Sequence, residues 1–249
     1  MGPEEVTEGR VRPAFYAARP GRLRDWWTLL HPPYTAWHLS YVVVGACLAP
    51  AVASSRLLAT LVAFFCAVGV AAHAYDELQG RPLRTGIPDR VLAGACVAGL
   101  SCALALGVVG VLRVGVVLVP FLVVGPVLVV AYNADLFGGM FHTDLGFALS
   151  WGAFPVLTAY VAQAGDLSWS AVVAAAGATA LSLAQRSLST PARQLRRRAA
   201  RVSGAVLLGD GTRIELDREG LLAPLERGLR ALAWASVLFA SALAVHRLG

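Results

Sequence analysis

Long apolar runs constrain the fold of this chain more than any other feature of its sequence. Each has roughly the 20 residues that a helix needs to cross the hydrocarbon core of a bilayer. The mean hydropathy of +0.64 and a charged fraction of 14% also lie outside the usual range of soluble domains. We therefore expect an all-α integral membrane protein, a bundle of about seven transmembrane helices. The expected spans are residues 34–53, 57–74, 91–111, 114–131, 145–164, 168–184 and 229–246.

The remaining composition excludes several other classes. The first 30 residues are polar and mixed in charge, which does not fit a cleavable signal peptide. All 21 basic residues are Arg, so lysine chemistry is excluded. The cysteines fall inside expected spans and have neither zinc-site nor disulfide-framework spacing, so we interpret them as packing residues. They are Cys47, Cys66, Cys96 and Cys102.

The distribution of arginine predicts the orientation in the membrane. With the N-terminus in the cytoplasm, only Arg56, Arg113 and Arg247 lie outside, which agrees with the positive-inside rule. An odd number of spans then places the C-terminus outside a multi-pass cell-membrane protein. The net charge of +6 is explained by this topology and indicates no nucleic-acid partner. We divide the chain into a cytoplasmic leader with an interfacial helix (1–33), a six-helix bundle (34–186), a cytoplasmic basic segment with a β-hairpin (187–228) and a last span (229–249).

The cytoplasmic end of the second span carries the most concentrated set of candidate functional side chains. His73, Asp76 and Glu77 are spaced i, i+3 and i+4, so a continued helix places them on one face. Ionisable groups at this depth are costly unless they face a cavity or a partner. The segment that follows includes Arg81 and Arg84, and Pro82 and Gly86 are expected to end the helix.

A second polar loop follows the fourth span on the same side. It contains Asn133, Asp135 and Asp144 but no Arg, which is unusual for a cytoplasmic loop. Its negative charge favours a nearby cation, either a metal or the arginines of the first loop. The alternative is that Asn133 and Asp135 end one helix and that Thr143 or Asp144 caps the next.

Two further features lie after the sixth span. The basic run Arg193–Arg198 is typical of a juxtamembrane helix attracted to anionic lipid headgroups, and a diphosphate-binding role for Arg186 or Arg193 is the sharper alternative. Residues 206–208 and 213–216 flank an Asp-Gly turn, which predicts a small β-hairpin. We expect this hairpin to pack on the cytoplasmic face, over the two polar loops.

The order of these features resembles the UbiA superfamily of intramembrane prenyltransferases. The resemblance rests on the Arg- and Trp-rich leader, on the polar motif after the second span with its Arg81-Pro82-Leu83-Arg84-Thr85-Gly86 segment, and on the second polar loop. The family motif N-x-x-x-D-x-x-x-D is degenerate here. The second acidic motif of the family, after the sixth span, is replaced by residues 184–191, which contain no acid. The chain would thus be a divergent member.

The resemblance implies a prenyltransferase or prenyl cyclase that takes an isoprenoid diphosphate and a lipophilic acceptor. It implies Mg²⁺ held by Asp76 and Glu77, with Asp135 as a third catalytic acid. The substrate-binding residues that we assign on this basis are His73, Arg81, Arg84, Asn133 and Arg186. The alternative function is a catalytically inactive isoprenoid-binding or accessory protein, and a small transporter fits least well because no charged residue marks a path through the midplane.

Overall fold

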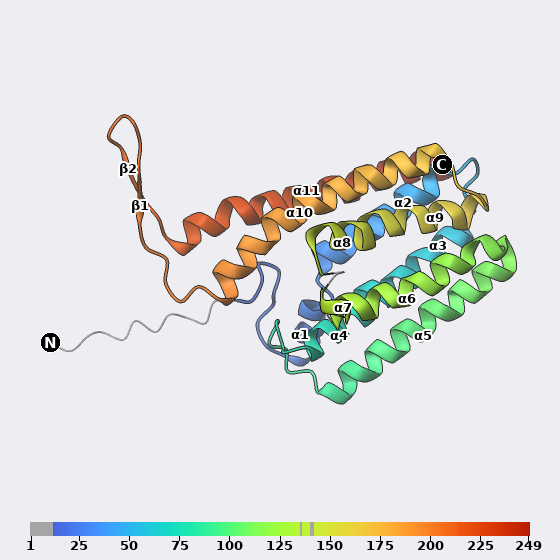
Figure 1. The fold of residues 1–249 in the computed structure, drawn as a ribbon, viewed down its shortest axis with the longest axis horizontal. Helices are drawn as coiled ribbons and strands as arrows, with labels where there is room; N and C mark the ends of the chain where they lie inside the picture. Colours follow the sequence, from blue (N-terminus) through green and yellow to red (C-terminus); the bar gives the residue numbers. More distant parts are fainter. Residues whose placement is uncertain (1–11, 135, 140–141) are drawn as a thin grey trace.

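The computed structural model is a bundle of helices with one two-stranded sheet projecting from it (Figure 1). It describes residues 12–134, 136–139 and 142–249. The helical elements are α1 (Arg22–Leu29), α2 (Pro32–Cys47), α3 (Ser54–Phe64), η1 (Phe65–Ala72), α4 (His73–Leu78), α5 (Asp89–Val114), η2 (Val116–Leu118), α6 (Val119–Asn133), α7 (Leu136–Gly139), α8 (Asp144–Ala148), η3 (Leu149–Ala153), α9 (Phe154–Ala164), α10 (Trp169–Arg197) and α11 (Arg218–Leu248).

Six helical stretches in the described part of the chain are long and apolar enough to cross a membrane, which confirms the class of multi-pass helical membrane protein. In three of them, successive elements join into one continuous span: α3, η1 and α4; η2 and α6; and α8, η3 and α9. The six stretches are Ser54–Leu78, Asp89–Val114, Val116–Asn133, Asp144–Ala164, Trp169–Arg197 and Arg218–Leu248.

The first of the seven expected spans corresponds to α2, which is shorter than the apolar run that contains it. Its 16 residues span about 24 Å, less than the roughly 30 Å of a bilayer core. The helix ends at Cys47, three residues before Pro50, a residue type that disfavours helical backbone in the position before it. Trp37 and Val42 are fully buried, because α2 packs against α9 and α11. A complete seventh crossing therefore stays a prediction.

Close backbone approaches hold the bundle together at two glycines. A Cβ atom on Gly45 of α2 would lie 2.1 Å from the carbonyl oxygen of Val156 in α9, and one on Gly99 of α5 would lie 2.5 Å from that of Cys66 in η1. The close crossings of α2 with α9 and of α5 with η1 are consequently possible because glycine has no side chain at these two positions. Both η1 and η3 are π-helical, and such turns often mark functional regions of α-helices.

The last two long helices lie side by side, and the end of α10 carries the hairpin (Figure 1). α10 continues through the predicted boundary at residue 186 and through Pro191 as far as Arg197. The predicted hairpin is present as β1 (Ala205–Leu207) and β2 (Arg213–Glu215). Both strands are exposed along their length and project away from the bundle, so the hairpin does not cover the polar loops.

Residues 12–20, rather than the hairpin, pack against this end of the bundle. Ala14 and Ala17 are buried against the end of the bundle. Arg197 Nε donates a hydrogen bond to the carbonyl oxygen of Pro13 (3.1 Å), and Arg196 Nη1 donates one to that of Arg12 (3.3 Å). The end of the bundle where this segment, α4 and the C-terminal turns of α10 meet is called the arginine-rich end below. The other end carries the C-terminus and is called the opposite end.

Candidate functional site

The loop after α4 is organised by the carboxylate of Glu77. Oε2 accepts a hydrogen bond from the backbone N–H of Leu83 (2.9 Å), while Oε1 accepts one from the N–H of Thr85 (2.8 Å) and one from its hydroxyl (2.9 Å). The side chain of Glu77 has no exposed surface. Both oxygens are thus committed to donors from the loop, as expected for a buried carboxylate.

The side chain of Arg81 also stabilises the loop after α4. Its Nη1 donates to the carbonyl oxygen of Ile87 (2.6 Å), and its Nη2 forms an ion pair with Asp89. Both Arg81 and Arg84 have a φ of 56°, which is uncommon for a residue with a side chain and indicates a tightly bent loop. The side chain of Arg84 is exposed, and no hydrogen bond to it is present among the described residues. Arg81 therefore shapes the loop, whereas Arg84 remains available.

His73 and Asp76 belong to a different group of side chains, which we call the polar cluster: Tyr16, His31, Tyr34, His73 and Asp76. The ring of His73 stacks on that of His31 with centroids 4.1 Å apart, and Tyr16 Oη lies 2.9 Å from His31 Nδ1. The rings of Tyr16 and Tyr34 pack edge to face at 5.6 Å. Within the described residues, Asp76 has no hydrogen-bond or ion-pair partner. His31 Nε2 is buried there without a partner as well.

The pKa of Tyr16 shows which charges converge on this cluster. Burial raises the pKa well above its usual value, and the neighbouring Tyr34 and Asp76 raise it further. Arg197 and Arg193 act in the opposite direction. The carboxyl group of Asp76 and two guanidinium groups therefore lie within electrostatic range of a single hydroxyl.

The pKa of His31 is lowered well below its usual value. Burial is the largest cause, and the nearby His73, Arg197 and Arg193 each lower it further. The imidazole is consequently neutral at pH 7. An additional positive charge here would be opposed by the arginines, whereas an anion would be favoured.

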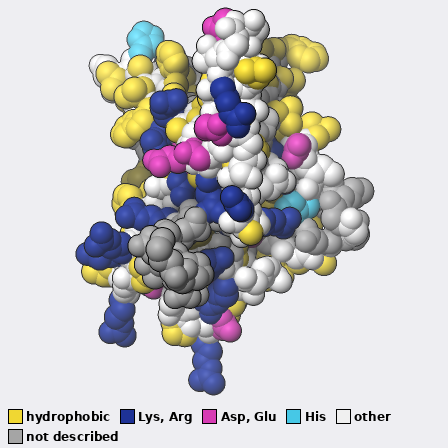
Figure 2. Space-filling model, turned by 90° about the vertical axis from the view of Figure 1, so that its left-hand side faces the viewer, with side chains coloured by type: hydrophobic (Ala, Val, Ile, Leu, Met, Phe, Trp, Pro, Cys, Tyr) yellow, Lys and Arg dark blue, Asp and Glu magenta, His cyan; other side chains and the backbone are white. Residues whose placement is uncertain are grey.

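The arginines belong to one face of α10, which we call the arginine face: Arg186, Arg193 and Arg197. Their i, i+7 and i+11 spacing places them along one side of the helix. Arg193 donates to the hydroxyls of Ser189 (3.3 Å) and Thr190 (3.1 Å). In the described part of the chain, no carboxylate lies within ion-pair distance of Arg193 or Arg197. Figure 2 shows arginine side chains gathered over this end of the molecule.

Arg186 connects the arginine face to the second polar loop. Its Nε pairs with Asp144 (2.9 Å) and its Nη1 donates to Tyr132 Oη (3.0 Å), while its guanidinium lies over the ring of Phe147 at 5.2 Å. Tyr132 in turn stacks on His142, with ring centroids 4.6 Å apart. The cation that meets the negative charge of this loop at Asp144 is Arg186 of α10, and not an arginine of the first loop as we expected.

The other predicted residues of the second loop do not join this arrangement in the described structure. Asn133 Nδ2 donates to the carbonyl oxygen of Val129 (2.7 Å), one turn earlier in α6, as a helix-terminating side chain does. Asp135 lies outside the described residues. Thr143 accepts a hydrogen bond from the N–H of Gly146 (3.0 Å), so Thr143 is the cap of α8.

The donors for the magnesium site that we predict do not fit together here. Glu77 is buried and its two oxygens are occupied by loop donors, which leaves Asp76 alone of the predicted pair. The described residues also contain no group of three or more His, Cys, Asp or Glu side chains that could hold a metal ion. We therefore assign no step to a metal.

Sequence reasoning missed the contribution of the N-terminal segment and of Arg197. Tyr16 and His31 are brought to His73 only by the return of residues 12–20 to the bundle, for which no local pattern exists. The spacing of Arg186, Arg193 and Arg197 was a usable signal, because a helix continued through Pro191 aligns them. Searches against models of protein families, curated proteins and solved structures give no match.

Proposed function

We propose that this chain is a divergent intramembrane prenyltransferase of the UbiA type that binds the diphosphate of an isoprenoid on its arginine face. One observation carries the proposal: Arg193 and Arg197 have no carboxylate partner among the described residues, yet they lie beside the polar cluster at the end of an apolar bundle. The tail of such a substrate would remain in the apolar bundle.

Guanidinium groups suit this task because their planar N–H forks match phosphate oxygens, and because they are less strongly hydrated than an ammonium group. Arg193 and Arg197 supply two positive charges without a carboxylate partner among the described residues, and Arg186, paired with Asp144, lies on the same helix face. Charge of this kind stabilises the negative charge that develops on a leaving diphosphate. The arginines thereby replace much of what a metal would supply.

The proposed reaction is the transfer of a prenyl group from its diphosphate to the acceptor. The bond between C1 of the prenyl group and the diphosphate oxygen breaks, and its electron pair leaves with the diphosphate. A nucleophilic atom of a lipophilic acceptor forms the new bond to C1 and loses a proton. We assign the receipt of that proton to Asp76, which has no competing partner among the described residues. Assistance by Mg²⁺ at Asp76 remains a prediction.

A second candidate function is isoprenoid binding without turnover, in a carrier or accessory protein. The commitment of Glu77 to Leu83 and Thr85 favours it, because only Asp76 of the first acidic pair can then serve in catalysis. In both functions the arginine-rich end faces the cytoplasm of a cell-membrane protein, and the run Arg193–Arg198 contacts anionic headgroups.

Thermal unfolding of the purified protein in detergent tests the proposal. Geranylgeranyl diphosphate should raise the melting temperature, and geranylgeraniol, which lacks the diphosphate, should not. Losing one charge-assisted pair costs roughly 1.5–3 kcal/mol, so Arg193→Gln should weaken apparent affinity at least about tenfold. Arg84→Gln is the matched control, since it removes an exposed arginine from the same end without touching the arginine face.

The results of these unfolding experiments distinguish the candidate binding sites and the two candidate functions. A shift that survives Arg193→Gln but is lost in Arg84→Gln would move the diphosphate to the loop and refute the arginine face. A shift that requires Mg²⁺ and disappears in Asp76→Ala would support a metal at Asp76. Release of inorganic diphosphate with a lipophilic acceptor distinguishes the enzyme from the carrier. No shift with any ligand would refute both candidate functions.

A further inference from the structure

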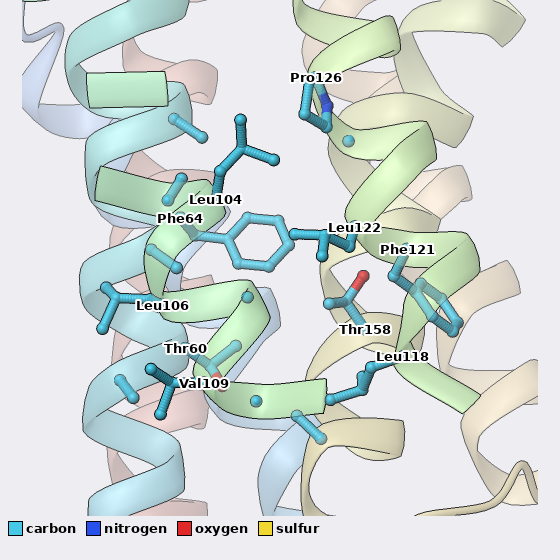
Figure 3. A pocket seen from close by; sticks show the side chains of 18 of the residues that line it. Thr60, Phe64, Leu104, Leu106, Val109, Leu118, Phe121, Leu122, Pro126 and Thr158 are labelled. Carbon is cyan, nitrogen blue, oxygen red and sulfur yellow. The ribbon is translucent and has the colours of Figure 1, made fainter. Parts of the chain in front are cut away.

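A cavity of about 510 Å³ lies inside the bundle, away from the arginine face (Figure 3). Its walls come from α3, η1, α5, α6 and α9, and its volume is within the range of small-molecule sites. In Figure 3 the ring of Phe64 points toward Leu122, and Leu104 lies beside them. The middle of the cavity is thus lined by large apolar side chains.

The two threonines labelled in the cavity wall, Thr60 and Thr158, do not make the cavity polar. Thr60 Oγ1 donates to the carbonyl oxygen of Arg56 (2.8 Å), and Thr158 Oγ1 donates to that of Phe154 (2.7 Å). Each hydroxyl is therefore satisfied within its own helix. The interior consequently favours a hydrocarbon chain over a polar ligand.

Positive charge is confined to one end of the cavity. Arg56, in the first turn of α3, and Arg113, in the last turn of α5, both line it at the opposite end of the bundle. Arg56 Nη1 donates to the carbonyl oxygen of Gln163 (3.0 Å). Neither guanidinium has a carboxylate within ion-pair distance among the residues that the structure describes. Two uncompensated charges thus stand at the mouth of an apolar cavity.

The length of the cavity corresponds to one leaflet of a membrane. Its lining follows the α3–η1 helix from Ser55 to Val68, which corresponds to about 20 Å at 1.5 Å per residue. A bilayer is roughly 40–45 Å thick when its headgroup regions are included, so one leaflet measures about 20–22 Å from the headgroups to the midplane. A cavity that begins at the arginines thus reaches about as deep as the midplane.

We propose that this cavity binds an anionic glycerophospholipid, with its phosphate at Arg56 and Arg113 and one acyl chain in the apolar interior. Charge complementarity selects the headgroup, because a phosphate supplies the negative charge that the described protein lacks at this position. The match in depth selects a lipid of a single leaflet. This site lies at the opposite end from the arginine face and does not depend on the proposed prenyl-transfer function.

Lipid-dependent thermal unfolding in detergent tests this site. Dioleoylphosphatidylglycerol and dioleoylphosphatidylcholine have the same chains, and only the first carries a net negative charge. The anionic lipid should raise the melting temperature of the wild type at lower concentration than the zwitterionic one. Arg113→Gln should shift the midpoint of the phosphatidylglycerol titration at least about tenfold upward. Its side chain has no hydrogen bond in the described structure, so folding without lipid should be unaffected.

Two further variants make the test specific. Ala103→Phe fills the apolar interior without touching the arginines and should abolish the response. Arg247→Gln is the matched control, because Arg247 lies at the same end but donates to the carbonyl oxygens of Ala49 and Pro50 outside the cavity. An equal response to both lipids, an unchanged response in Arg113→Gln or Ala103→Phe, or an equal loss in Arg247→Gln would overturn the proposal.

Discussion

Replacing Glu77 by alanine is the most informative single perturbation of the loop that follows α4. In the wild type the buried carboxylate accepts hydrogen bonds from the backbone of Leu83 and from both the backbone and the hydroxyl of Thr85. Alanine offers no acceptor, so these donors remain inside the protein without a partner. The loop must then either open to water or bear the cost of the unpaired groups.

The magnitude follows from the number of donors that lose their acceptor. Two buried backbone N–H groups at roughly 1–3 kcal/mol each give a loss of about 4 kcal/mol in the free energy of unfolding. The hydroxyl of Thr85 can rotate toward another acceptor, so we leave it out of this sum. Glu77→Gln keeps one carbonyl oxygen for Thr85 and turns an amide N–H toward Leu83. It should therefore cost about half as much.

Unfolding in detergent, followed by helical circular dichroism, measures both variants, and amide hydrogen exchange of residues 79–88 reports on the loop itself. Asp76→Ala is the matched control: it removes the adjacent carboxylate, which has no partner among the described residues, and should change stability little. If Glu77→Ala unfolds like the wild type and its loop remains protected, the carboxylate does not hold the loop and the reasoning fails.

Three further predictions concern other parts of the bundle. Folding depresses the pKa of His31, so its neutral form contributes stability above the unfolded pKa of about 6.5, and this contribution is lost at roughly 1.4 kcal/mol per pH unit below that value. The free energy of unfolding should therefore depend less on pH between pH 7 and 5 in His31→Gln than in the wild type. Equal pH dependence in the two proteins would contradict this. Gly45→Ala should lower the melting temperature, because relieving a 2.1 Å approach to the carbonyl oxygen of Val156 costs roughly 1–3 kcal/mol; an unchanged melting temperature would argue against the α2–α9 contact. A mild oxidant should join Cys66 to Cys102, whose Sγ atoms lie 3.5 Å apart; counting maleimide-reactive thiols after denaturation should show two fewer, and no loss would argue against the η1–α5 packing.

Hydropathy and turn chemistry predicted the coarse fold well. Apolar runs of sufficient length gave six of the expected spans, and the Asp-Gly turn gave the hairpin, because both signals are local. The length of α2 was harder to predict from the sequence. Its apolar run continues past Cys47, so hydropathy alone does not indicate where the helix ends. The position of the hairpin was also beyond prediction, since nothing within residues 205–215 specifies what they contact.

The candidate site was predicted only in part for a related reason. An acidic residue at the end of a helix looks the same in sequence whether it binds a metal or accepts loop N–H groups, and Glu77 does the latter. The substrate-binding role of Arg186 stays a prediction, and its contacts with Tyr132 and Asp144 depend on the packing of three spans. The contribution of Tyr16 depends on a long-range return of the chain, which periodicity cannot reveal.

The segment at residues 12–20 gives the arginine face an internal competitor. Arg197 already donates to the carbonyl oxygen of Pro13, so an anion that binds this guanidinium through the same N–H must displace a segment of the protein's own backbone. The observed affinity for any such ligand is then the intrinsic affinity multiplied by the fraction of molecules in which the segment has moved away. Shortening the chain ahead of α1 would thus tighten binding without adding a single contact to the ligand.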